Sequence, residues 1–257
     1  MLIVLSPAKR LDFAEPKTPL PATRARMMED AASLARTARR QTQADLRRLM
    51  HLSEDLAKLN QARFKAFDPD SPDMGLQAAI AFAGDVYQGL DARSLDADAM
   101  AFAQDHLRIL SGLYGVLRPL DRLQPYRLEM GTRLKTRRGE TLYDFWGDRI
   151  SKQLNADAEG HADPTLVNLA SQEYFGAVDA KALTLPIVTP QFREIRDGES
   201  RIISFFAKKA RGVMARYAVE QRIENARDLK GFDRDGYRFD ASASTETDWI
   251  FTRRGNN

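Results

Sequence analysis

The sequence predicts a mixed α/β (α+β) structure over residues 1–257, organised as a single compact domain or as two tightly merged lobes. Three observations predict it. Strand-like and helix-like segments intermix along the chain without the regular alternation of a βαβ protein. The 257 residues are 43% hydrophobic, which is enough to bury a large core. No repeat, low-complexity tract or long linker marks the start of a second domain.

The N-terminal half begins with a short strand and continues mainly as helices. The apolar run at residues 2–5 predicts a buried strand, and Ser6 followed by Pro7 predicts a helix start, because serine caps helices and proline fits their first turn. Apolar residues at helical spacing then predict helices over 24–40, 43–50, 53–67, 77–83 and 96–110.

The C-terminal half mixes helices with strands. The predicted segments are a helix over 142–154, a strand over 165–170, strands 185–196 and 201–206 joined by the turn Asp197-Gly198, a helix over 207–223, and closing strands in "YRFD" and "WIFTR".

The composition favours a cytoplasmic protein. No cysteine occurs, which excludes disulfides and thiolate metal sites and fits a reducing compartment. The first apolar run is far shorter than that of a secretion signal, and no window approaches the roughly 18 apolar residues of a membrane span. We therefore expect a cytoplasmic location and no membrane partner.

Positive charge is concentrated in three segments of a chain whose formal net charge is only +3. Residues 24–48 carry seven basic and three acidic side chains, residues 118–138 carry seven and two, and residues 204–217 carry four and none. Such segregation predicts a positively charged face or cleft that suits a polyanion or a phosphate-bearing ligand. The alternative is that folding scatters the three segments.

The predicted helix over 207–223 has a basic face opposite its apolar stripe. Lys208, Lys209, Arg211 and Arg216 lie on it without a carboxylate, so they repel one another unless an anion is supplied. Gly212 lies among them, and a mid-helix glycine costs about 0.5–1 kcal/mol, which indicates close approach to the backbone. The approaching group is either a ligand or a neighbouring element.

Two strand ends place a serine where a helix start would offer free amides to an anion. These are "LIVLSPAK", with Ser6 and Lys9, and "LVNLASQEY", with Ser171. Simple capping is the alternative. A further set, Asn168, Ser171 and Glu173 together with Tyr126 and Glu129, has the chemistry of an acid/base site. Glu129 and Glu173 are therefore candidate catalytic residues of an enzyme, although no spacing shows that they converge.

The histidines indicate no metal centre. His51, His106 and His161 have no paired spacing such as HxxxH and no nearby acidic cluster of the usual type. We therefore expect neither metal nor cofactor, with only an oxygen-ligand site for a hard cation left open. His106 is interpreted as a structural residue of its helix.

A helix-turn-helix segment is loosely similar to a helix-hairpin-helix element, which offers backbone amides to DNA phosphates. It is "QADLRRLMHLSEDLAKLNQARF", residues 43–64, with a tight turn at 51–53. The turn lacks the glycines usual in that element.

Six ordered motifs, spread from Met1 to about Arg253, resemble the YaaA family of bacterial peroxide-stress-resistance proteins. They are "LIVLSPAKRLDF", "LSGLYGVLRPLDRLQPYRLEMG", "YDFWGD", "VNLASQEYF", "ISFFAKKARGVMARY" and "GYRFD". The resemblance implies an unusual mixed α/β fold with a positively charged cleft and a helix-hairpin-helix-like element. It also implies DNA binding and protection against peroxide through lowered free iron.

The family's recurrent polar positions match thirteen residues here. One departure is Arg10, where the family often has a small polar residue. The matching positions are Ser6, Lys9, Arg118, Tyr126, Arg127, Glu129, Asn168, Ser171, Glu173, Tyr174, Lys208, Lys209 and Arg211.

The leading hypothesis is a peroxide-stress protein that binds DNA phosphates without sequence preference, with Tyr126 and Tyr174 stacking on unpaired bases. The rival hypothesis is an enzyme acting on a small phosphate- or nucleobase-containing ligand, with Glu173 or Glu129 as acid/base. Direct iron sequestration is a third, which leaves the cations unexplained. Convergence of Lys9, Arg127 and Lys208 with Glu173 is the arrangement that a structure has to test.

Overall fold

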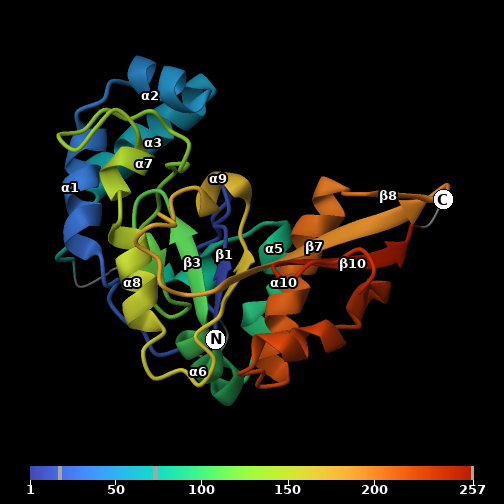
Figure 1. Cartoon of the computed structure of the whole chain (residues 1–257). Coiled ribbons are helices and arrows are strands. Elements are labelled where there is room, and N and C mark those ends of the chain that lie inside the picture. The colour runs from blue at the N-terminus through green and yellow to red at the C-terminus, as the bar shows by residue number, and fades with distance from the viewer. Residues whose placement is uncertain (17–18, 72–74, 256–257) are drawn as a thin grey trace.

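Figure 1 shows the computed structural model of the chain, which describes residues 1–16, 19–71 and 75–255. These residues form a mixed α/β structure around a sheet with the strand order β4-β3-β1-β6-β7-β10-β9, in which β8 pairs with β7. The strands are β1 (Leu2–Leu5), β3 (Leu107–Ser111), β4 (Gly115–Leu117), β6 (Leu166–Leu169), β7 (Ile187–Arg196), β8 (Glu199–Arg201), β9 (Arg238–Phe239) and β10 (Asp248–Arg254).

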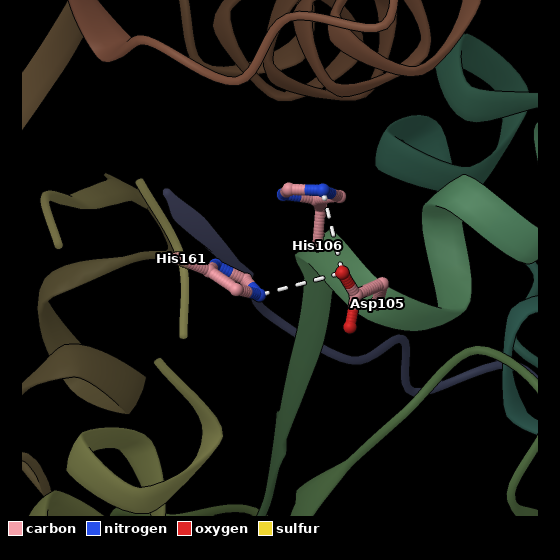
Figure 2. Close-up of side chains that lie close together, drawn as sticks. All are labelled: Asp105, His106 and His161. Atoms are coloured by element: carbon pink, nitrogen blue, oxygen red, sulfur yellow. Dashed lines mark ion pairs between the residues drawn. The ribbon is translucent and has the colours of Figure 1, made fainter. Parts of the chain in front are cut away.

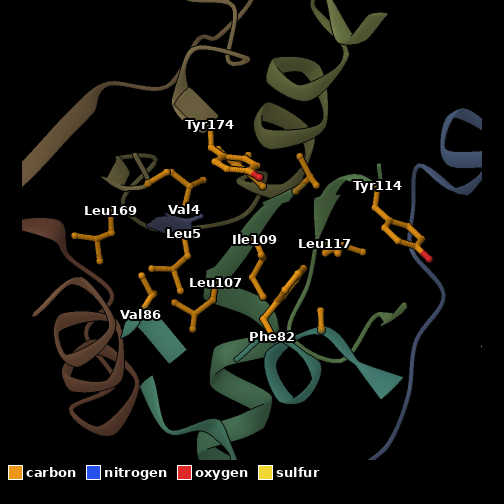
Figure 3. Close-up of a cluster of buried hydrophobic side chains, with 14 of the residues drawn as sticks. Val4, Leu5, Phe82, Val86, Leu107, Ile109, Tyr114, Leu117, Leu169 and Tyr174 are labelled. Atoms are coloured by element: carbon orange, nitrogen blue, oxygen red, sulfur yellow. The ribbon is translucent and has the colours of Figure 1, made fainter. Parts of the chain in front are cut away.

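The centre of the sheet is parallel and buried. β1 lies between β3 and β6 and pairs with both in parallel register. All four residues of β1 are fully buried, as expected of a strand covered on both faces. Figure 3 shows Val4 and Leu5 of β1 close to Leu107 and Leu169 of the neighbouring strands. Phe82 and Val86 belong to the same hydrophobic core as these strand residues.

The helices lie in two groups. In Figure 1, α1, α2, α3, α7 and α8 lie to the left, and α5 and α10 lie with β7 and β10 to the right. Within the described residues, no helix combines the length and the apolar character that crossing a bilayer requires. The helices are α1 (Met28–Arg39), α2 (Gln43–Met50), α3 (Glu54–Ala66), α4 (Ala78–Ala81), α5 (Asp85–Leu90), α6 (Ala97–His106), α7 (Leu142–Trp146), α8 (Arg149–Asp157), α9 (Gln172–Phe175) and α10 (Ser204–Glu220).

Local capping explains several helix boundaries. Thr42 and Asp45 form a reciprocal capping box at the start of α2. Ser53 and Asp96 accept hydrogen bonds from backbone amides in the first turns of α3 and α6. The smaller elements are β2 (Leu76–Gln77), which pairs with β5 (Arg122–Leu123) in a separate two-stranded sheet, and the 3-10 helices η1 (Ala92–Ser94), η2 (Ala226–Gly231) and η3 (Arg234–Gly236).

Helix α10 packs against α5 through a pair of glycines. A Cβ on Gly212 would overlap the Val86 carbonyl, and a Cβ on Gly89 would overlap the Lys209 carbonyl. The glycine cost in α10 is therefore explained by the approach of a neighbouring helix. Of the two interpretations of Gly212 from the sequence, packing against an element is confirmed and approach of a ligand is wrong.

Three predicted helices differ from the structure. Residues 6–10 form no helix after β1. The predicted helix over 96–110 ends at His106, where β3 begins, because residues 107–111 are needed in the buried sheet. The predicted helix over 142–154 is divided at Gly147, whose φ of 49° lies outside the right-handed helical region, into α7 and α8.

The candidate helix-hairpin-helix segment forms α2 and α3, joined through residues 51–53. His51 ends α2 in the left-handed conformation, with a φ of 52°. The two helices are therefore confirmed, whereas a helix-hairpin-helix element and its contact with nucleic acid stay predictions.

Candidate functional site

A cavity of about 770 Å³ opens at the carboxyl ends of β1 and β6. The strand order reverses at β1, because β3 lies on one side of it and β6 on the other. Parallel sheets commonly bind ligands at the carboxyl ends of their strands beside such a reversal. The described residues that line it from the strand ends, α5, α9 and α10 include Ser6, Lys9, Tyr87, Ser171, Glu173, Tyr174, Lys208 and Arg211.

Ser6 and Ser171 join the two strand ends at the cavity. The Ser171 amide donates a hydrogen bond to Ser6 Oγ at 2.8 Å, and the two hydroxyl oxygens lie 3.2 Å apart. The Tyr87 hydroxyl donates to the Ser6 carbonyl at 2.9 Å. The prediction of a helix start at Ser6 was wrong. Ser171 does precede α9, but its side chain makes no capping hydrogen bond.

Lys208 and Arg211 line the cavity without partners. Neither side chain makes a hydrogen bond or ion pair with any residue that the structure describes. Arg211 is partly buried, and burial lowers the pKa of its guanidinium below the ordinary value. Two cations side by side on one helix, one of them partly desolvated, form a site that an anion would stabilise.

The other two cations of α10 are paired, which corrects the expectation that this face lacks carboxylates. Lys209 Nζ lies 3.7 Å from Asp235 Oδ2. Arg216 contacts Glu220 at 2.7 Å and Asp91 at 3.6 Å. Glu220 lies four residues after Arg216, a spacing that helical periodicity allows, whereas Asp91 and Asp235 come from distant segments that the spacing did not indicate.

Lys9 lines the cavity and shares the carboxylate of Glu129 with Arg127. Its Nζ lies 3.0 Å from Glu129 Oε2, and Arg127 Nη2 lies 2.9 Å from Glu129 Oε1. Glu173 Oε1 accepts a hydrogen bond from the Gly131 amide at 3.0 Å. Lys9, Glu173 and Lys208 therefore line one cavity, and Arg127 reaches it only through Glu129.

Both candidate acid/base carboxylates already have partners. Glu129 is held between two cations, and Glu173 by a backbone amide. Asp12, Asp85 and Asp91 also line the cavity. Asp12 accepts from the Ala14 amide at 2.9 Å, and Asp91 faces Arg216. Asp85 and Arg10 of the lining make no side-chain hydrogen bond or ion pair with a described residue, and neither do the two α10 cations Lys208 and Arg211.

The candidate tyrosines are buried. Tyr126 is 5% exposed and lies 2.6 Å from Ser111 Oγ through its hydroxyl, so no ring face is open for stacking. Tyr174 is 9% exposed and lines the cavity. Burial raises the pKa of both hydroxyls, which keeps them protonated.

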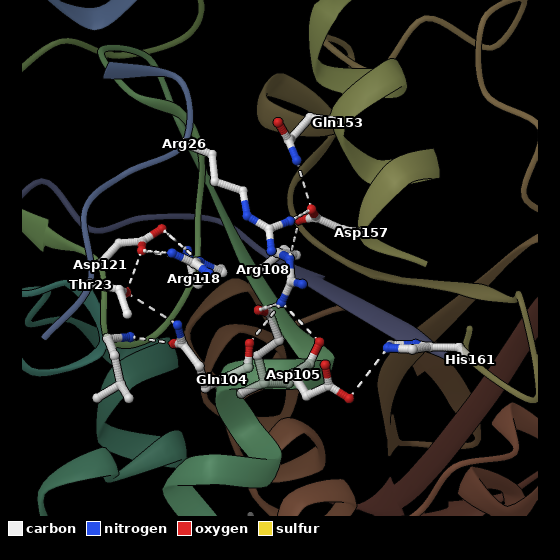
Figure 4. A network of polar contacts seen from close by, with 12 residues as sticks. Thr23, Arg26, Gln104, Asp105, Arg108, Arg118, Asp121, Gln153, Asp157 and His161 are labelled. Atoms are coloured by element: carbon white, nitrogen blue, oxygen red, sulfur yellow. Dashed lines mark hydrogen bonds and ion pairs between the residues drawn. The ribbon is translucent and has the colours of Figure 1, made fainter. Parts of the chain in front are cut away.

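Two other predicted residues have structural partners. Asn168 Oδ1 accepts a hydrogen bond from the Ala170 amide at 3.0 Å and so shapes the turn after β6. Arg118 lies outside the cavity and contacts the fully buried Asp121 at 2.8 Å (Figure 4). Arg118 also donates to the Arg24 carbonyl at 3.2 Å.

The contribution of α5 to the cavity was not predicted from the sequence. Asp85, Val86 and Tyr87 line the cavity, and Tyr87 fixes the Ser6 carbonyl. The helix has only six residues, too few for a clear apolar period, so local spacing gave no signal for it.

Comparison with known proteins identifies the family. A family model described as peroxide stress protein YaaA matches residues 1–243. A UPF0246 protein of Caulobacter vibrioides (strain NA1000 / CB15N) is 65% identical over 253 residues, covering 98% of this chain and 99% of that protein. A UPF0246 protein of Phenylobacterium zucineum (strain HLK1) is 65% identical over 253 residues, covering 98% of this chain and 95% of that protein. A relative in Ruegeria pomeroyi (strain ATCC 700808 / DSM 15171 / DSS-3) is 56% identical over 254 residues, covering 98% of each chain. The chain therefore belongs to the YaaA family of peroxide stress proteins.

Proposed function

We propose that this peroxide stress protein acts in the cytoplasm by binding DNA through its phosphates, without sequence preference, at the cavity beside β1 and β6. The single observation that carries the proposal is the pair Lys208 and Arg211, two cations that line the cavity and have no partner among the described residues. Binding at DNA would concentrate the protein where free iron and peroxide cause damage.

The chemistry of the cavity suits a phosphate group. Arginine and lysine donate charge-assisted hydrogen bonds to phosphate oxygens, and serine hydroxyls add neutral ones. Ser6 and Ser171 lie on the lining with both cations. A phosphate would supply the direct anionic contact that Lys208 and Arg211 lack among the described residues.

The cavity volume limits how DNA would bind. At about 770 Å³, it is within the roughly 300–1,000 Å³ range of small-ligand pockets and is too small for a duplex. One phosphate or nucleotide would enter, and the rest of the strand would lie across the surrounding surface. Glu129 and Glu173 already contact cations or a backbone amide, which does not favour acid/base catalysis. DNA binding is therefore preferred over an enzymatic function.

The proposal is tested with fluorescein-labelled duplex and single-stranded DNA of random sequence. We expect affinity to fall steeply with salt. Lys208→Ala/Arg211→Ala should weaken binding at least about tenfold, because hydrogen bonds to charged groups contribute about 1.5–3 kcal/mol each.

The matched control is Lys181→Ala/Arg227→Ala, which removes the same charge from two exposed residues outside the cavity. Its binding should stay close to that of the unaltered protein. Affinity that does not depend on salt, or an equal loss in both double variants, would contradict a phosphate contact at this cavity. Binding of a nucleoside monophosphate by a protein that binds no DNA would favour the small-ligand alternative.

A further inference from the structure

A second cluster of functional groups lies at the opposite end of the same strands. Asp105 and His106 end α6 directly before β3, and His161 lies in the loop before β6. Figure 2 shows both histidine rings facing a carboxylate oxygen of Asp105. Asp105 Oδ2 lies 3.5 Å from His106 Nε2 and 3.4 Å from His161 Nε2. This end carries the amino termini of the parallel strands, whereas the cavity lies at their carboxyl ends.

One backbone oxygen orients both rings. The Met1 carbonyl lies 2.8 Å from His106 Nδ1 and 3.0 Å from His161 Nδ1. A carbonyl oxygen only accepts hydrogen bonds, so each Nδ1 must carry the proton and donate it. In a neutral ring, Nε2 then holds a lone pair, and both Nε2 atoms face the Asp105 carboxylate. Three electron-rich atoms facing one another repel unless a proton or a metal cation lies between them.

The arrangement has the second shell that metal-binding histidines need. A ligating histidine usually donates its other ring N–H to a carbonyl or carboxylate, which fixes its tautomer and orientation. Here the Met1 carbonyl does so for both rings. The His106 ring also stacks on Phe102, with centroids 4.0 Å apart, and lies 4.7 Å from the His161 ring. Two imidazolium rings at that separation would repel, whereas a single divalent cation satisfies both.

The two histidines of the cluster are buried, whereas its carboxylate is exposed to solvent. Both histidine side chains are only 8% exposed, whereas the Asp105 side chain is 66% exposed. A cation can therefore enter from solvent past the carboxylate and keep water in its remaining positions. The N-terminal amine acts on His106 with a positive charge, and Asp163 and Glu224 next to that amine offset it.

We propose that Asp105, His106 and His161 bind a divalent transition-metal ion through Oδ2 and the two Nε2 atoms. One candidate ligand atom from each residue lies within 4.8 Å of the others. The two Nε2–Oδ2 separations are close to the roughly 3.3 Å expected between tetrahedral ligands bonded at about 2.0–2.1 Å. Two imidazoles and one carboxylate favour Zn²⁺ or Fe²⁺ over Mg²⁺ or Ca²⁺, which prefer oxygen ligands.

The test uses the full chain, stripped with a chelator and titrated with Zn²⁺ against a chromophoric competitor. We expect one Zn²⁺ per chain, with no competition from excess Mg²⁺. Asp105→Asn and His161→Gln should each lower the affinity by more than about tenfold. Loss of a group that only supports a ligand already lowers metal affinity by about 10–100-fold, and loss of a ligand should cost more. The control His51→Asn alters the remaining histidine, which is exposed, and asparagine tolerates its left-handed backbone.

A second measurement needs no variant and so remains decisive if a variant fails to fold. In ¹⁵N-labelled wild-type protein, Zn²⁺ should shift the Nε2 signals of two histidines while their Nδ1 protons persist. Absence of uptake, unchanged affinity in Asp105→Asn, or a response of His51 alone would overturn the proposal. Because the two sites lie at opposite ends of the strands, DNA affinity should not change in Asp105→Asn.

Discussion

The backbone amide of Ser171 donates a hydrogen bond to Ser6 Oγ at 2.8 Å and joins the ends of two adjacent parallel strands. The residues are 165 positions apart in the chain. This bond connects two residues that line the cavity of the proposed phosphate contact. Its two serines are not equivalent, because only Ser6 accepts from a backbone amide.

Ser6→Ala should destabilise the protein more than Ser171→Ala. The first leaves the Ser171 amide without its acceptor, which costs about 1–3 kcal/mol when the group is buried. This amide is partly buried, so we expect about 1 kcal/mol. Ser171→Ala removes only the hydroxyl contact at 3.2 Å. Urea unfolding of both variants measures the difference, and equal losses would show that the amide finds another acceptor.

Gly212→Ala should destabilise the fold although alanine favours helices. Its Cβ would overlap the Val86 carbonyl, so α5 and α10 would have to separate. Overpacking of this kind costs about 1–3 kcal/mol. Gly231→Ala is the control, since the nearest atom to its Cβ is Tyr217 Oη at 3.5 Å, an ordinary contact. Thermal unfolding should separate the two, and a Gly212→Ala protein as stable as the control would refute close packing there.

Asp157→Asn should be among the most damaging polar substitutions. Asp157 is 7% exposed and pairs with Arg26 and Arg108, and it accepts from Gln153 at 2.7 Å (Figure 4). Burial lowers the pKa of Arg108 to about 10, which leaves it charged at neutral pH. Loss of one partner of a buried ion pair costs about 3–5 kcal/mol.

Arg26→Gln provides the comparison for that network. The Arg26 side chain is 42% exposed, so water can replace its contact, and the loss should be no more than about 1 kcal/mol. Denaturant unfolding of the two variants checks the ranking. A larger loss of unfolding free energy in Arg26→Gln than in Asp157→Asn would contradict this ranking.

Glu194 should make stability fall at acidic pH. Burial raises its pKa, but the hydrogen bonds and charges of Arg253 and Arg196 outweigh that effect and bring the pKa below 4.5. The ionised carboxylate therefore stabilises the folded state fully above about pH 4.5, and this contribution is lost as the pH falls through the folded-state pKa. Melting temperatures of wild type and Glu194→Gln should differ at pH 6 and converge below pH 4.5. A constant difference would mean that ionisation of Glu194 is not linked to folding.

Much of the fold could be predicted where the signal is local. The predicted strand at residues 2–5 and the helix at 43–50 have the bounds of β1 and α2. The helix at 207–223 was found within three residues, although Lys209 gained a carboxylate partner, Asp235, that lies outside the helix and that its spacing did not indicate. The helix predicted over 96–110 failed because periodicity does not show where a helix ends and a buried strand begins.

The sequence by itself determined the family, the local elements and the residue types from which both sites are built. Only the tertiary structure decided which of these residues meet. It placed Lys9 with Lys208, paired Arg118 with Asp121, and brought His106 to His161 although they are 55 positions apart. The physical reason is that such meetings depend on strand order and on burial between distant segments, whereas periodicity and capping report only interactions within a few residues.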